Sequence, residues 1–376
     1  MIHRDIQQFA QNCRHEIFRL LEDLCNIPAP SHFEEKRAQY CKNYLESIGA
    51  GGVYIDEAYN VVFPLNCDKS QKITVFAAHT DTVFPDMEPM SYFDDGEKVH
   101  SPAVADDTAS VVVLLLMAKY FIENKIKPPN GILFVCNSCE EGLGNLKGMR
   151  KIFDDFDSRI KQFITFDSNL DKVNDACVGS HRYEIEVITQ GGHSYEEFGN
   201  INAISVASEI VSKIYEIKIP QKEGTKTTYN VGTFSGGTSV NTIAQNAKFL
   251  CEYRSDDIGG LSYMEEEFKR IFDGAKNSGA NIRITRVGER PCANIDKKMV
   301  DELKELVVPE IEKVIGKKVS FKSGSTDCNI PLSKGIPALC IGANIHGKIH
   351  TREEWVDKQS IIRGLEIAIS VGMKLV

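Results

Sequence analysis

The stretch ILFVCNSCEEGLGN, residues 132–145, decides how the rest of the chain is interpreted. A short apolar run, typical of a buried β-strand, ends in a Cys-x-x-Cys pair, Cys136 and Cys139, followed by two adjacent glutamates, Glu140 and Glu141. If the thiols carry the chemistry, the stretch predicts a redox or thiolate-zinc module. If the carboxylates carry it, the stretch predicts a hydrolase.

The cysteines of the chain argue against the thiols. The chain has 11 of them, scattered without regular spacing, and the start MIHRDIQQFAQNC lacks the apolar core of a signal peptide. We therefore expect reduced thiols and a cytoplasmic protein. A thiolate-zinc site needs further ligands, typically a second Cys-x-x-Cys, and the sequence has none. The favoured interpretation is that Cys136 and Cys139 only pack at the end of a strand.

Composition excludes two classes of partner. The 376 residues carry 44 basic and 53 acidic side chains, a net charge of −9, with no Lys/Arg block, so nucleic-acid binding is not expected. The longest apolar run, VVVLLLMA at 111–118, is far too short to span a membrane. It predicts a buried helix instead.

The first part of the chain alternates between helical and strand-like patterns. Helices are predicted at about 4–25, 33–48, 107–123 and 146–154, and strands at 53–56, 60–65, 72–78, 131–137 and 163–167. Apolar strands that alternate with helices predict an α/β domain whose central mixed sheet is covered on both faces.

The pattern of apolar and polar residues changes after residue 178. Alternating stretches such as HRYEIEVITQ, at 228–234 and at 247–254, with helical patterns near 201–216 and 261–277, predict a smaller α+β sandwich. From about 293 the α/β texture returns, with a helix near 297–314, a strand at 336–342 and a helix near 358–374. We therefore expect a discontinuous domain of residues 1–177 and 293–376, interrupted by an inserted domain of residues 178–292.

Acidic and imidazole side chains follow the predicted strands. His79 and Asp81 come just after one strand, and residues two apart in an extended chain point the same way, so Asp81 can support the imidazole from behind. A plain surface strand end is the alternative. Asp106 and Asp107 precede a helix, where they are either helix-capping acids or carboxylates that bridge two metal ions.

The remaining candidates complete a metal-binding set. Glu140 and Glu141 repel each other at a buried strand end unless a cation offsets their charge. Asp167 ends another strand, and His350 lies in a late loop. Ligands of open α/β sheets gather at the carboxyl ends of strands. Histidine and carboxylate ligands without thiolates suit zinc, manganese or cobalt and leave one glutamate to act as a base.

The ordered motifs HTDTV, ADD, CEEG, FDSN and HT resemble the di-zinc exopeptidase family of peptidase T, carboxypeptidase G and the aminoacylases, over essentially the whole chain. The resemblance implies two Zn2+ ions per chain, with Mn2+ or Co2+ as substitutes, and a cis peptide bond between Asp106 and Asp107. It implies that Glu140 is the general base and that Asp81 orients a ligand. The metal ligands that it implies are His79, Asp106, Glu141, Asp167 and His350, with Asp106 bridging.

The resemblance extends to the inserted domain. It implies a homodimer in which His193 enters the partner's active site to stabilise the oxyanion, and substrate contacts from Asn241 and Arg254. For Arg254, a surface salt bridge is the alternative. The motif GSTDCN, which begins at Gly324, is similar to a glycine-rich loop that lines the family's pocket.

The sequence also departs from the family pattern. Thr108 stands where a lysine is common, and the glycine usual early in the ADD motif is missing. Aspartate at 167 is more typical of the family's peptidases than of its deacylases, so we expect an exopeptidase acting on short peptides, similar to tripeptidases. The alternatives are an amidohydrolase of N-acyl amino acids and, in another class, a catalytically silent protein that binds small peptides.

Overall fold

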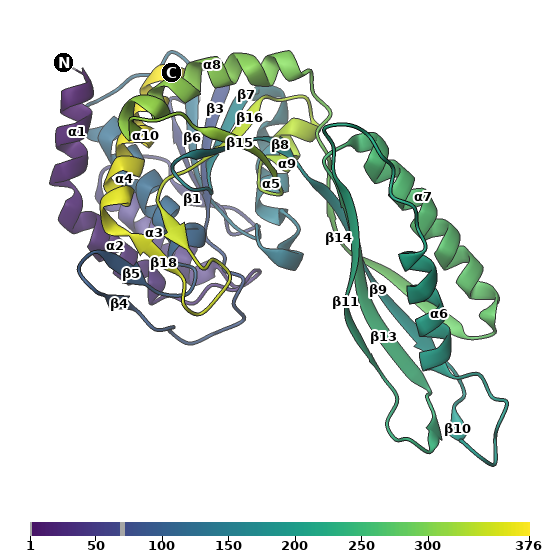
Figure 1. Ribbon diagram of the computed structural model, residues 1–376. Helices are drawn as coiled ribbons and strands as arrows, with labels where there is room; N and C mark the ends of the chain where they lie inside the picture. The colour runs from purple at the N-terminus through teal and green to yellow at the C-terminus, as the bar shows by residue number, and fades with distance from the viewer. Residues whose placement is uncertain (1, 68–71) are drawn as a thin grey trace. The chain divides into compact units, whose positions relative to one another are not determined.

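The computed structural model describes residues 2–67 and 72–376, which divide into two compact units (Figure 1). Residues 1–177 and 294–376 form the large unit, and residues 178–293 form the inserted unit. Among the described residues, no helix has both the length and the apolar character required to cross a membrane.

A mixed sheet of eight strands lies at the centre of the large unit. Its strands, in spatial order, are β1 (Tyr54–Ile55), β2 (Val61–Leu65), β6 (Gly131–Asn137), β3 (Ile73–His79), β7 (Ile160–Phe166), β16 (Ala338–Ile341), β8 (Lys172–Cys177) and β15 (Ser320–Gly324). β6, β3, β7 and β16 run parallel, whereas β2 and β8 run antiparallel to β6 and β16. The predicted mixed α/β sheet is confirmed.

Stacked phenylalanine rings connect the central strands of the sheet. Every residue of β3 and β6 is buried, so both faces of the sheet are covered, because successive side chains point to opposite faces. On one face the ring of Phe134 stacks on Phe63 and Phe76, at centroid distances of 5.6 and 6.1 Å, and Phe76 stacks on Phe166 at 6.3 Å. These contacts hold the four strands in register.

Eight α-helices accompany this sheet in the described part of the large unit. They are α1 (Ile2–Asn12), α2 (Arg14–Cys25), α3 (Glu35–Ser47), α4 (Ala109–Glu123), α5 (Lys147–Phe156), α8 (Lys297–Ile315), α9 (Asn329–Ser333) and α10 (Lys358–Leu375). α4 packs against β3 and β6, and α10 packs against α4 and α8. The buried helix predicted from VVVLLLMA is therefore the centre of α4.

Two helix predictions need correction. A single helix at 4–25 is wrong, because the chain breaks at Cys13 so that α1 can pack against α10 and α2 against α4. The apolar period continues across the break and therefore hides it. The helix expected from residue 107 begins at Ala109, after an irregular turn over Val104–Thr108 in which Asp106 and Asp107 have non-helical backbone angles, and no side chain caps its start.

A second, smaller sheet of the large unit consists of β4 (Phe93–Asp94), β5 (Lys98–His100), β17 (His346–Gly347) and β18 (Trp355–Asp357). The hairpin between β17 and β18 carries His350. Because β18 also pairs with β5, the hairpin is anchored on its returning side.

The inserted unit is an antiparallel sheet with two helices. Its strands, in spatial order, are β11 (Thr227–Gly236), β13 (Asn246–Ser255), β9 (Gly179–Ile188) and β14 (Asn281–Arg290), and a two-stranded ladder pairs β10 (Gly192–His193) with β12 (Thr242–Ile243). Helices α6 (Ala203–Tyr215) and α7 (Ile258–Ala275) share one core with alternate residues of β9 and β13 (Figure 1). The sequence analysis did not predict β14, although exposed polar residues alternate with Ile282 and Ile284 at its start.

All eleven cysteines are reduced and buried. Burial raises the pKa of Cys139 to about 12, and a hydrogen bond with Cys41 together with burial raises that of Cys136. Since the thiolate is the reactive form, we expect a thiol reagent such as DTNB to leave the native protein unmodified and to titrate all eleven thiols in denaturant. Rapid native modification mapped to Cys136 or Cys139 by mass spectrometry would contradict a purely structural role.

Candidate metal centre

The carboxyl ends of β3, β6 and β7 meet at one edge of the large sheet, because these strands are parallel neighbours. β3 ends at His79, which pairs with Asn137 at the end of β6. Glu140 and Glu141 follow β6, and Asp167 follows β7. The fold therefore brings together the strand-end residues selected from the sequence.

Asp106 lies between two histidines. Its Oδ1 is 3.1 Å from Nε2 of His79, and its Oδ2 is 3.0 Å from Nε2 of His350. The same His350 nitrogen is 3.4 Å from Oε1 of Glu141. Ligand atoms of His79, Asp106 and Glu141 lie within 4.8 Å of one another. Each oxygen of Asp106 thus faces a different imidazole, as expected of a carboxylate shared by two cations.

The site concentrates negative charge in a buried place. Burial, together with the charge of Asp106, raises the pKa of both Glu141 and Asp167. Burial opposes ionisation of Asp106 as well, but hydrogen bonds from His350 and His79 outweigh it and hold the pKa of Asp106 below its ordinary value. A divalent cation would offset this repulsion. The donor set of imidazole nitrogens and carboxylate oxygens fits zinc or a harder divalent ion.

One oxygen of Glu141 adds support for a cation. Its Oε1 is buried, and its 3.4 Å contact with Nε2 of His350 does not have the geometry of a hydrogen bond. A buried charged acceptor without a hydrogen bond is costly. A metal ion bound between Glu141, His350 and Asp106 would satisfy it.

Asp81 fixes the positions of both glutamates. Its Oδ1 accepts the backbone N–H of Glu140 and its Oδ2 that of Glu141, both at 2.9 Å, and Oδ2 also accepts Ser31 Oγ–H at 2.7 Å. Nδ1 of His79 is 3.1 Å from the backbone oxygen of Asp81 and 3.4 Å from its Oδ1. A proton on Nδ1 leaves the Nε2 lone pair pointing to the side of Asp106.

Glu354 holds the turn that carries Asp106, and our sequence analysis did not select it. Its Oε1 accepts the backbone N–H groups of Ala105 at 2.8 Å and Asp106 at 3.0 Å. Burial and the charge of Asp106 raise the pKa of Glu354 to about 7. The available signal was its place in HTREEW, four residues after His350. The Asp106–Asp107 peptide bond in this turn is cis, as predicted.

Arg37 contacts Thr108, where the family commonly has lysine. Arg37 is fully buried, and its guanidinium donates to Oγ1 of Thr108 at 3.1 Å and to the backbone oxygen of Thr80 at 3.0 Å. Thr108 in turn donates to the backbone oxygen of Ala103 at 2.6 Å. The buried guanidinium group of Arg37 therefore links the end of β3 to the Asp106 turn. Asp107 does not cap α4, since its Oδ2 accepts the backbone N–H of His79 at 3.1 Å.

The loop after β6 gives Cys139 a structural role. Glu34 Oε1 accepts the backbone N–H of Cys139 at 2.9 Å and lies 3.2 Å from its sulfur. In the same loop Gly144 packs directly against the backbone of Cys139. A side chain would not fit there, because its Cβ atom would lie 2.7 Å from the Cys139 carbonyl oxygen. Glu140, next in sequence, has only 5% of its surface exposed.

The residues expected to contact substrate are distributed over both units. Gly324 ends β15 in the large unit, where a Cβ would clash with the side chain of Asn174. Asn241 lies before β12 of the inserted unit, and its backbone oxygen accepts Ser194 N–H at 3.0 Å. Arg254, on β13, donates to Glu252 from two nitrogens, at 2.8 and 3.1 Å. This ion pair is the alternative that the sequence left open for Arg254.

His193 ends β10 and is exposed. Its Nδ1 accepts backbone N–H groups of Tyr195 and Glu196, both at 3.3 Å. These donors leave the proton of a neutral imidazole on Nε2, which can then act as a hydrogen-bond donor.

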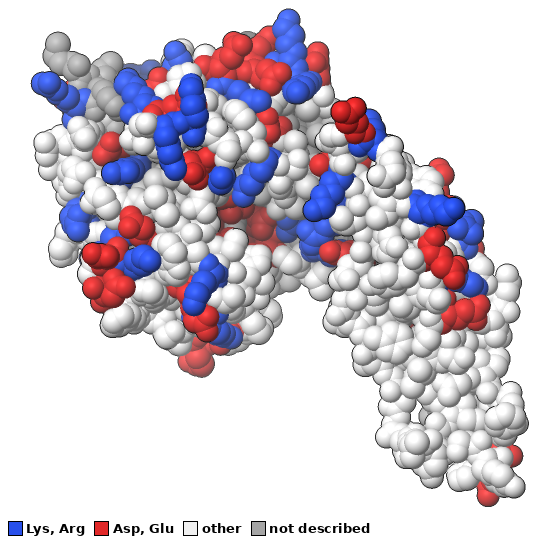
Figure 2. Space-filling view, in the orientation of Figure 1, with Lys and Arg blue, Asp and Glu red and all other residues white. Residues whose placement is uncertain are grey.

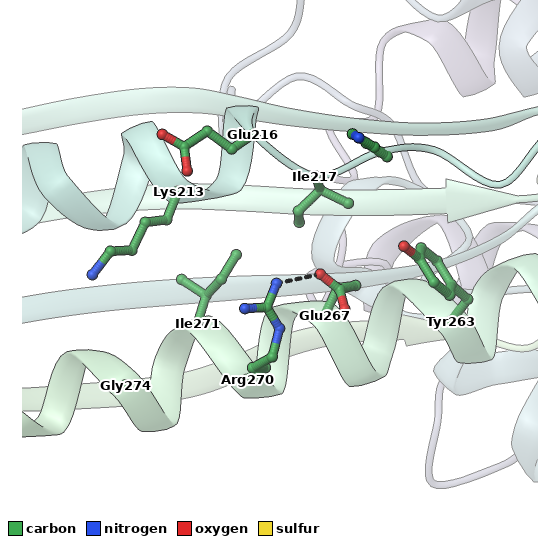
Figure 3. A pocket seen from close by; sticks show the side chains of 9 residues that line it. Lys213, Glu216, Ile217, Tyr263, Glu267, Arg270, Ile271 and Gly274 are labelled. Carbon is green, nitrogen blue, oxygen red and sulfur yellow. Dashed lines mark hydrogen bonds and ion pairs between the residues drawn. The ribbon is translucent and has the colours of Figure 1, made fainter.

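The inserted unit also has a pocket of about 460 Å³, lined by α6, α7 and the turn after α6 (Figure 3). Its Arg270 donates to Glu267 at 2.6 Å, and Lys213 pairs with Glu209. The lining residues include neither histidine nor cysteine. The pocket therefore lacks the imidazole and thiolate groups that commonly bind zinc.

Comparisons with known proteins agree with the fold. The chain is 22% identical to a succinyl-diaminopimelate desuccinylase of Corynebacterium glutamicum, over 89% of this chain and 90% of that one. A tripeptidase structure from Staphylococcus aureus superposes with a TM-score of 0.74 at 22% identity, covering 96% and 99% of the two chains. The Bacillus subtilis YXEP protein, described as a dinuclear metal binding peptidase, superposes with a TM-score of 0.65 at 14% identity, covering 97% and 99%.

The sequence profile of Peptidase family M20/M25/M40 matches residues 75–373, most of the chain. That range contains the selected strand ends and the His350 hairpin. The protein belongs to this family of metal-dependent peptidases and amidohydrolases.

Proposed function

We propose that this protein is an exopeptidase that hydrolyses an amide bond of short peptides, with two zinc ions and Glu140 as general base. The observation that carries the proposal is the position of Asp106. Each of its two oxygens faces one histidine, and the buried pair Glu140 and Glu141 lies beside it. Aspartate rather than glutamate at position 167 favours a peptidase within the family.

The two sides of Asp106 define two groups of ligands. His350 and Glu141 lie on the Oδ2 side. His79 lies on the Oδ1 side, and we place Asp167 with it because His79 ends β3 and Asp167 follows β7, the parallel neighbour of β3. Zinc would fit both groups, with manganese or cobalt as substitutes. Bound ions of this kind polarise a scissile carbonyl and lower the pKa of a water molecule.

Glu140 performs the proton transfer in this proposal. Its backbone N–H is held by Asp81, so its main chain has a fixed position next to that of Glu141. Glu140 takes a proton from the attacking water and delivers it to the leaving amine. Its low exposure excludes bulk water, which strengthens electrostatic interactions within the site.

We propose that His193 acts across a homodimer, on the oxyanion in the partner's site. Its Nε2 is the nitrogen available to donate, because backbone N–H groups face Nδ1. Exposed apolar side chains surround β10 in the inserted unit, namely Tyr195, Phe198 and Val240. Figure 2 shows this end of the unit largely free of charged side chains, apart from acidic ones near its tip. Such a surface is typical of a protein interface.

A second candidate function is hydrolysis of an N-acyl amino acid, favoured by the similarity to a desuccinylase along almost the whole chain. A panel of tripeptides, dipeptides and N-succinyl or N-acetyl amino acids separates the two functions. With added zinc we expect turnover of the peptides, loss of turnover with a chelator, and recovery when metal is restored. Turnover of the acylated substrates alone would favour the second function.

Replacement of Glu140 tests the mechanism. Glu140→Gln removes the base but keeps the size of the side chain, so kcat should fall by about 10²–10⁴-fold while the metal content stays that of the unaltered protein. Glu353→Gln, which removes an exposed carboxylate paired with Lys348, is the control and should have normal activity. Normal turnover by Glu140→Gln with a full metal content would refute the assigned base.

Complementation tests the role of His193. His193→Ala and Glu140→Ala should each be inactive alone, whereas a mixture should regain activity as heterodimers form, because one of the two sites then has both residues. Subunit exchange is verified with two affinity tags. If exchange occurs without recovery, His193 does not act across the dimer.

A further inference from the structure

Two loops of the large unit carry proposed metal ligands from segments far apart in sequence. Asp167 begins the loop after β7, and His350 lies in the hairpin between β17 and β18. The loop after β7 meets the segment that leads into β17 at a parallel bridge between Asn169 and Asn344, where Leu170 N–H donates to the Asn344 oxygen at 2.9 Å. The side chain that joins them is His346.

Both ring nitrogens of His346 contact asparagine side chains. Nε2 is 3.0 Å from Nδ2 of Asn169, and Nδ1 is 2.7 Å from Oδ1 of Asn344. The backbone N–H of His346 also donates to Oδ1 of Asn169 at 3.2 Å. Asn169 therefore contacts His346 through both ends of its amide group.

The backbone contact assigns the tautomer of the imidazole. A backbone N–H can only donate, so the Asn169 atom that it meets is the amide oxygen, and the NH2 group faces Nε2. Nε2 must then accept, and the ring proton is on Nδ1, which donates to Asn344 Oδ1. A protonated ring would place an N–H against an NH2 group. Burial lowers the pKa of His346, which favours the same neutral form.

The surroundings leave little room for water to replace these bonds. Asn344 is 1% exposed, and His346 and Asn169 are half-buried. Removal of the imidazole would leave the Asn344 oxygen as a buried acceptor without its donor, which is costly. His350, by contrast, is exposed, so its position depends on how its hairpin is held.

We propose that His346 is a positioning residue that, as the neutral Nδ1–H tautomer, fastens the hairpin of His350 to the loop of Asp167. This inference rests on the proposed function, because it takes Asp167 and His350 as metal ligands. His346 itself uses both nitrogens for the asparagines and is not a ligand. Its role is to keep the two sides of Asp106 at the spacing that two cations require.

Zinc affinity, measured on metal-stripped protein by competition with a chelator, tests the inference. Loss of a residue that supports metal ligands typically lowers metal affinity by about 10–100-fold, and we expect a loss of this size in His346→Ala and in Asn169→Ala. The double variant should lose no more than either single one, because both substitutions break the same link. His100→Ala is the control: His100 lies on β5 of the same small sheet, bonded to exposed Asp95, and its loss should leave the affinity unchanged.

A spectroscopic measurement on the unaltered, metal-free protein adds an independent readout. Long-range ¹H–¹⁵N correlation spectra should show His346 protonated on Nδ1 and not on Nε2, with the signal assigned by its loss in His346→Ala. An Nε2–H tautomer, or unchanged zinc affinity in His346→Ala, would overturn the inference. Failure of the unaltered protein to bind zinc at all would instead refute the proposed function.

Discussion

The carboxylate of Asp81 is the interaction on which the rest of the site depends. It accepts two successive backbone N–H groups, those of Glu140 and Glu141, and the same residue supports the imidazole of His79. Two adjacent acids are thus oriented through their main chain, which leaves their side chains available for different tasks. The carboxylate also accepts a hydrogen bond from the hydroxyl group of Ser31. A neutral side chain at position 81 could not accept these three hydrogen bonds as strongly.

The surrounding structure extends this arrangement outward. Glu354 holds the Asp106 turn from behind, Arg37 links that turn to the end of β3, and Glu34 holds the loop after β6. Each supporting group is buried. Buried charges of this kind are costly unless they are paired or hydrogen-bonded. The buried charges of the site therefore lower the stability of the fold, but they also fix the positions of the proposed metal ligands.

The sequence predicted the central strands β2, β3, β6, β7 and β16 of the large sheet and the polar residues that follow them, because both depend on local patterns. Apolar runs such as GILFVCN indicate buried strands, and polar residues after parallel strands must meet at one edge of the sheet. The break at Cys13 and strands β8, β14 and β15 were missed. No change in the apolar period marks the break, and β8 (KVNDAC) and β15 (SFKSG) contain few apolar residues.

The supporting residues of the site were harder to predict. Arg37 is a single basic residue within a helix, and Glu354 and His346 act through partners far away in the sequence. No local pattern separates such residues from ordinary polar side chains. The roles of Arg254, Asn241, Gly324 and His193 remain predictions that rest on the family resemblance.

The order of the segments along the chain has a consequence for synthesis of the protein. His79, Asp106, Glu141 and Asp167 all precede the inserted unit, whereas His350 follows it. A ribosome therefore completes the whole inserted unit before the last proposed ligand exists. A growing chain can assemble one side of the centre early, but the Oδ2 side of Asp106 lacks its histidine until residues beyond the inserted unit have been made. The proposed two-cation centre therefore cannot be complete before the inserted unit has been synthesised.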